Sequence, residues 1–127
     1  RLSRVGFDNI KGYLLGGIKS WIEANKNIES IENVDPEDFA ALYSKNDLNI
    51  LDVRSQSENN ISSMRESLNI PLINLKDKVE SINEKDKLYI HCKGGYRSMI
   101  ACSILNSKSK TNIANIKGGY DKISTLI

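Results

Sequence analysis

The sequence predicts an α/β fold with a parallel sheet that helices cover on both faces. Short apolar runs that fit strands alternate with helical segments over about 100 residues, which is the order expected of a parallel sheet. These runs are apolar without strict alternation, as strands buried on both faces are. In such sheets, functional sites form at the carboxyl ends of the strands.

Composition limits the functional classes. The 127 residues fit about one compact domain, with 39% apolar and 27% charged residues. A net charge of +2 is too balanced to indicate nucleic acid or an anionic membrane as a partner, and no apolar run approaches the roughly 20 residues of a membrane span. Two cysteines and one histidine disfavour a structural zinc site and a disulfide framework. We therefore expect no metal or cofactor, and a reducing, cytoplasmic location.

The first block, residues 1–27, is too short to bury a core of its own. It reads as a glycine-broken extended piece followed by a short helix at residues 18–24. Because the chain opens with Arg1 and shows no signal-peptide pattern, we expect it to be part of a longer protein. Residues 28–127 are predicted to form the main domain.

The first helix of the main domain is expected to begin at Pro36. Asp35 can serve as its N-cap, and proline is favoured at the first helical position. Val34 and Phe39 are spaced as a hydrophobic staple. This helix is expected to end near residues 45–47. By apolar runs and turn signals, further strands are predicted at 48–53, 68–70, 88–91 and 113–116, and further helices at 75–81, 98–105 and 120–127.

The loop after the strand 88–91 has the composition of an anion site. It reads Cys92, Lys93, Gly94, Gly95, Tyr96, Arg97 and Ser98, and an apolar helix follows. The two glycines allow a tight curl that points successive backbone N–H groups into one bowl, and the helix adds its positive end. Lys93 and Arg97 add full charges. Together these features favour the thiolate of Cys92, which is the nucleophilic form.

Three residues have a plainer alternative interpretation. Cys92 could be a small buried apolar residue beside a glycine turn, although its place between a strand and a helix favours reactivity. Cys102 lies inside the apolar helix and is expected to pack in the core. His91 is adjacent to Cys92 on a strand and so points to the opposite face. We expect it to be a satisfied, partly buried histidine rather than a base.

The run from His91 to Ser98 resembles the active-site loop of rhodanese-type sulfurtransferases. The segments 51–54 with Glu58, 69–72 and 116–120 resemble other motifs of that family, in the same order. The resemblance implies a central parallel sheet of about five strands with helices on both faces, and a persulfide carried on Cys92. Residues 93–97 would bind the substrate. The supporting residues would be Asp52, Arg54, Glu58 and Ser98, with Glu58 paired to Arg54.

Residues 6–21 are similar to the end of a preceding rhodanese-like domain. Asn9-Ile10 with Gly16-Gly17 has a counterpart in Asn112-Ile113 with Gly118-Gly119, although an ordinary loop and helix remains the alternative. This arrangement is similar to that of metallo-β-lactamase-type hydrolases with tandem rhodanese-like domains. The expected parent is therefore a persulfide-metabolising metallohydrolase, whose earlier domains would be partners of this one. The apolar side chains of the block need to be covered, so a dimer that forms through them is a further expectation.

The favoured function is sulfane sulfur transfer from a thiosulfate- or persulfide-type donor to a thiol acceptor. A module that only presents a persulfide or docks a partner is the alternative. A cysteine phosphatase is disfavoured, because the four residues between Cys92 and Arg97 are one fewer than such enzymes use, and the shorter loop fits a sulfur atom better than a phosphate.

Overall fold

The computed structural model describes residues 8–83 and 86–127. The chain divides into two compact units, one ending at Ser30 and the other running from Ile31 to Ile127. In the first unit, helix α1 (Ile18–Glu23) follows Gly17, whose φ is 61°. The Trp21 indole N–H donates to the carbonyl of Asn27 over 2.8 Å. None of the residues of α1 is buried.

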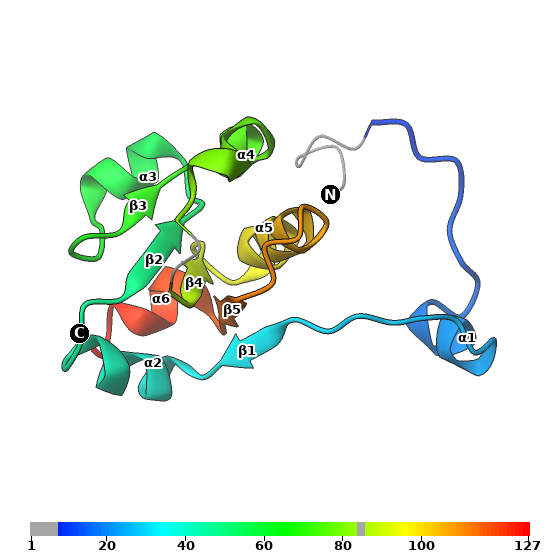
Figure 1. Cartoon of the computed structure of the whole chain (residues 1–127), viewed down its shortest axis with the longest axis horizontal. Coiled ribbons are helices and arrows are strands. Elements are labelled where there is room, and N and C mark those ends of the chain that lie inside the picture. The colour runs from blue at the N-terminus through cyan, green and yellow to red at the C-terminus, as the bar shows by residue number, and fades with distance from the viewer. Residues whose placement is uncertain (1–7, 84–85) are drawn as a thin grey trace. The chain divides into compact units, whose positions relative to one another are not determined.

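The second unit is built on one five-stranded sheet in which all neighbouring strands run parallel (Figure 1). Its strand order is β1-β5-β4-β2-β3, so β4 lies at the centre. The strands are β1 (Glu32–Val34), β2 (Asn49–Asp52), β3 (Leu68–Asn69), β4 (Leu88–His91) and β5 (Ile113–Ile116). The predicted fold class, with about five parallel strands, is confirmed.

Helices cover both faces of this sheet (Figure 1). Side chains of α4 (Leu72–Lys78), a 3-10 turn (Val79–Ser81) and α5 (Tyr96–Asn106) form a core with one face of β4 and β2. Side chains of α2 (Pro36–Tyr43) and α6 (Gly119–Ile123) form a second core on the other face, around Phe39, Tyr89 and Ile116. The remaining helix, α3 (Gln56–Ile61), has no buried residue.

Several element bounds differ from those expected. Strand β1 and helix α3 were not predicted. Helix α4 begins at Leu72, three residues before the predicted start. The reason is local: Pro71 precedes the helix, and the Leu72 N–H is satisfied outside it by the carbonyl of Val53 at 3.2 Å. At α2, Asp35 takes the N-cap position without a side-chain cap bond, and its carboxylate instead binds Lys117 at 2.9 Å.

Across the described residues, no helix combines the length and the apolar character needed to cross a bilayer.

Candidate active site

The candidate site lies where the central strand ends. Strand β4 stops at His91, so Cys92 stands at the carboxyl edge of the sheet, between the ends of β2 and β5. Gly95 is the N-cap of α5 with a φ of 93°, a left-handed conformation that only glycine adopts at low cost. The chain therefore reverses within three residues and enters α5 directly above the cysteine.

This reversal gives the Cys92 sulfur polar partners inside an otherwise apolar core. The Gly95 N–H donates to Cys92 Sγ over 3.1 Å, and the thiol lies 3.6 Å from the Ser98 hydroxyl oxygen. That hydroxyl in turn donates to the carbonyl of Gly95 over 3.0 Å. Cys92 is only 1% exposed. The Gly95 N–H is therefore placed to stabilise a negative charge on this sulfur.

The backbone of the loop is supported from below by the start of α6. The Tyr120 N–H donates to the carbonyl of Cys92 at 2.7 Å, and the Asp121 N–H donates to the carbonyl of Lys93 at 3.0 Å. Gly119, with a φ of 59°, packs against both carbonyls so closely that an added Cβ would overlap them. The first turn of α6 therefore holds the carbonyl groups of Cys92 and Lys93 in position.

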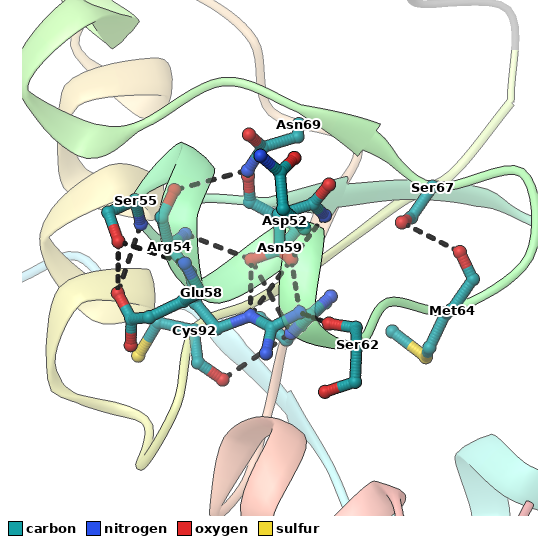
Figure 2. Close-up of polar contacts among 12 residues, drawn as sticks. Asp52, Arg54, Ser55, Glu58, Asn59, Ser62, Met64, Ser67, Asn69 and Cys92 are labelled. Atoms are coloured by element: carbon teal, nitrogen blue, oxygen red, sulfur yellow. Dashed lines mark hydrogen bonds and ion pairs between the residues drawn. The ribbon is translucent and has the colours of Figure 1, made fainter.

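Beneath the loop, Asp52 and Arg54 form a buried ion pair (Figure 2). Arg54 donates to both Asp52 carboxylate oxygens at 2.7–3.0 Å, and it also donates to the carbonyl of Ser62 at 2.8 Å. The Asn59 amide also donates to Asp52, at 3.0 Å. Burial acts to raise the pKa of Asp52, but the Arg54 hydrogen bonds and the other contacts outweigh it, so the pKa lies below its usual value. The Arg54 guanidinium also stacks over the Tyr120 ring at 4.0 Å.

The predicted pairing of Glu58 with Arg54 is wrong. Arg54 is fully engaged by Asp52, and Glu58 instead forms two contacts with Arg97, at 2.6 and 2.7 Å. Helix α3 positions Glu58 through a capping box, in which the Ser55 N–H donates to its carboxylate at 3.1 Å. The Arg97 hydrogen bonds lower the pKa of Glu58 to about 2, and the same pair raises the pKa of Arg97.

His91 is more deeply buried than expected, with no exposed surface. Its Nδ1 lies 3.4 Å from the carbonyl of Cys92, while its Nε2 has no hydrogen-bond partner among the described residues. Burial lowers the pKa of His91 to about 4, so the ring is neutral at neutral pH. The ring stacks on Tyr120, on the opposite side of the sheet from Cys92. This placement agrees with the prediction that His91 is not a base for Cys92, but the ring is not fully satisfied.

The other predicted binding residues form the outer part of the loop. Lys93 and Gly94 are exposed, and Tyr96 is 52% exposed. The structure thus brings together Cys92, Gly95, Ser98 and the Glu58–Arg97 pair, and places Asp52 and Arg54 beneath them. Sequence reasoning overlooked Ser55, Asn59 and Gly119 as contributors. Of these, only Ser55 carried a usable signal, because Ser55 followed three residues later by Glu58 is a capping-box pattern.

Cys102 packs in the core with no exposed surface, as predicted. Burial raises the pKa of its thiol to about 12, which keeps it protonated and unreactive. We therefore expect iodoacetamide to alkylate the folded protein at Cys92 alone, and to alkylate Cys102 only after unfolding in guanidinium. Peptide mass mapping of both samples checks this. Equal labelling of both cysteines in the folded protein would contradict the assignment.

Comparison with known proteins agrees with this geometry. The family model described as the rhodanese-like domain matches residues 35–126, which include every residue of the candidate site. The chain is 35% identical to the uncharacterized protein YqhL of Bacillus subtilis over 68% of its length and 67% of that protein. It is 30% identical to the putative sulfur carrier protein YrkF of the same organism, over 76% of the chain and 52% of that protein.

Two further likenesses concern a longer protein and a solved structure. The adenylyltransferase and sulfurtransferase UBA4 of Saccharomyces cerevisiae is 29% identical over 77% of the chain, which spans only 26% of that protein. A crystal structure of a rhodanese-related protein from Thermoplasma volcanium superposes with a TM-score of 0.67 at 26% identity, over 74% of this chain and 91% of that one. By its sequence match, its sheet order and its cysteine loop, the chain belongs to the rhodanese-like domain family.

Proposed function

We propose that this domain transfers sulfane sulfur through a persulfide on Cys92. In the first step the Cys92 thiolate attacks the outer sulfur of the donor. A new S–S bond forms, the donor S–S bond breaks, and sulfite or a thiolate leaves with the bonding electrons. In the second step an acceptor thiolate attacks the outer sulfur of the persulfide, which returns Cys92 as a thiolate. No change of net oxidation state is needed, so no cofactor is required.

The contact between the Gly95 N–H and Cys92 Sγ is the observation that carries this proposal. It shows that the loop directs a hydrogen-bond donor at the sulfur, and the left-handed conformation of Gly95 keeps the turn tight. The four residues between Cys92 and Arg97 make the loop one residue shorter than that of cysteine phosphatases, which favours binding of a sulfur atom over binding of a phosphate. The relatives named as a sulfur carrier and a sulfurtransferase support the same chemistry.

A domain that accepts a persulfide and presents it, without turning over, is the second candidate. The likeness to a putative sulfur carrier protein favours it specifically. Both candidates use the Cys92 persulfide, so they differ only in whether a small thiol acceptor discharges it.

A mass measurement tests the persulfide. After incubation with thiosulfate or with a low-molecular-weight hydropersulfide and removal of the excess, we expect the protein to gain about one sulfur atom. Addition of a thiol or of cyanide should then remove that atom, because either nucleophile attacks the outer sulfur. Release in repeated cycles supports transfer, whereas stable retention supports presentation.

Cys92→Ser is the matched control, since it keeps the size of the side chain and the Gly95 contact but removes the nucleophile. It should gain no mass. If the wild-type protein also gains none from either donor, the proposal is refuted.

The wider context stays a prediction. A parent chain of the metallo-β-lactamase type, with this domain as its sulfur-handling end, would carry a cluster of histidine and aspartate metal ligands before Arg1. Reading the complete gene tests this directly. A cytoplasmic location stays a prediction in the same way.

A further inference from the structure

We propose that Glu58 selects the sulfur donor by neutralising Arg97, so that the domain favours monoanionic hydropersulfides over the thiosulfate dianion. This inference rests on the proposed sulfur transfer and narrows its donor class. It assigns to Glu58 a specificity-determining role, exerted through the charge at the mouth of the loop.

The Glu58–Arg97 pair is geometrically complete. Both terminal nitrogens of the guanidinium donate to the carboxylate, one to each oxygen, at 2.6 and 2.7 Å. Paired in this fork geometry, the guanidinium has little remaining charge to offer an incoming anion. Both side chains are 30% exposed, so the pair is accessible from the surface.

Glu58 is held in place independently of Arg97. Its carboxylate accepts from the Ser55 N–H at 3.1 Å and from the Ser55 hydroxyl at 2.9 Å, which are the capping contacts of α3. An approaching anion would therefore have to displace a carboxylate that the helix start also retains. Since its pKa lies at about 2, Glu58 remains charged at neutral pH.

Arg97 is the second cationic residue of the cysteine loop, after Lys93. Arg97 follows Gly95, the donor to Cys92 Sγ, by two residues in the first turn of α5. The other arginine of the site, Arg54, is bound to Asp52 and 3% exposed. Neither arginine is thus available to a dianion, and Lys93 is the exposed cation of the loop.

Glu58→Gln tests the inference with reagents that differ only in charge. Iodoacetate and iodoacetamide both alkylate the Cys92 thiolate and release iodide, and the ratio of their rates cancels any change in thiolate availability. Removing the negative charge of Glu58 beside Arg97 should raise this ratio about fivefold. The ratio of thiosulfate to hydropersulfide loading rates should rise by a similar factor, because these two donors also differ by one charge. Added salt should reduce both gains.

Two further variants serve as controls for this experiment. Glu80→Gln removes the same charge from an exposed residue of the 3-10 turn after α4, next to Ile82 at the opposite end of β4, and should leave both ratios unchanged. Arg97→Gln leaves the Glu58 carboxylate without its cation and should lower both ratios. Labelling of Cys102 in any variant would reveal unfolding.

Unchanged ratios in Glu58→Gln would overturn the inference. The alkylation ratio does not depend on sulfur chemistry. If the wild-type protein takes sulfur from no donor but the alkylation ratio still shifts, the proposed sulfur transfer fails, while the control by Glu58 over anions that approach Cys92 is supported.

Discussion

Replacing Gly119 with alanine is expected to abolish sulfur loading on Cys92 and to destabilise the domain by about 3 kcal/mol. An added Cβ would overlap the carbonyl of Cys92 and would lie 2.6 Å from the carbonyl oxygen of Lys93. Both are backbone atoms, which cannot swing aside as a long side chain can. Gly119 also has a φ of 59°, which is unfavourable for alanine. To relieve the overlap, the loop must move away from α6 and lose the hydrogen bonds that hold it.

Urea denaturation and the mass measurement check this prediction together. Gly94→Ala is the matched control for stability, because it places the same methyl group in the cysteine loop itself, in open space. We expect that control to change the free energy of unfolding by less than about 0.5 kcal/mol. Equal stability of the Gly119→Ala and Gly94→Ala proteins would show that α6 does not constrain the loop.

Asp52→Ala is expected to lower the free energy of unfolding by about 3–5 kcal/mol. The carboxylate has no exposed surface and is the counter-ion of Arg54, which is 3% exposed. Without it the guanidinium remains buried and uncompensated, and the Asn59 amide also loses its acceptor. Because Arg54 stacks on Tyr120, whose N–H supports the loop, the loss should also impair sulfur loading.

The control for this variant is Asp35→Ala, which breaks an ion pair with Lys117 that is about half exposed on both sides. Pairs of that kind contribute about 0–1 kcal/mol. The two variants should also differ in pH dependence. The pKa of Asp52 lies below its unfolded value of about 3.9, so its stabilisation is complete above that pH and is lost as the pH falls through the folded pKa. Similar losses of stability in both variants at neutral pH would contradict the buried role of Asp52.

The strands that are buried on both faces are the ones that the sequence predicts best, whereas one short exposed strand and one exposed helix were overlooked. Strand 88–91 and strand 113–116 were predicted with their observed bounds because every one of their residues is buried. Strand β1 has three residues and no buried one, so no apolar run marks it. Helix α3 is polar except for the exposed Ile61 at its end, and it is stabilised by its cap rather than by packing, so periodicity could not reveal it.

Long-range polar partners limited the prediction of the site. Glu58 was assigned to Arg54 because both belong to one motif. In the structure, the Arg54 guanidinium instead forms its ion pair with the carboxylate of Asp52. The true partner, Arg97, lies 39 positions further along the chain. Nothing in a single sequence specifies such a pairing, whereas the position of Cys92 follows directly from the end of β4.

The order of strands also bears on how the protein is made. The first strand of the domain, β1, pairs only with β5, and the sulfur-bearing loop rests on α6, which follows β5. During synthesis from the N-terminus, Cys92 leaves the ribosome before Gly119 does. A nascent chain that has not yet reached α6 therefore exposes a cysteine without the hydrogen bonds that organise its loop. The loop acquires its two hydrogen bonds from α6 only when translation of this domain is almost complete.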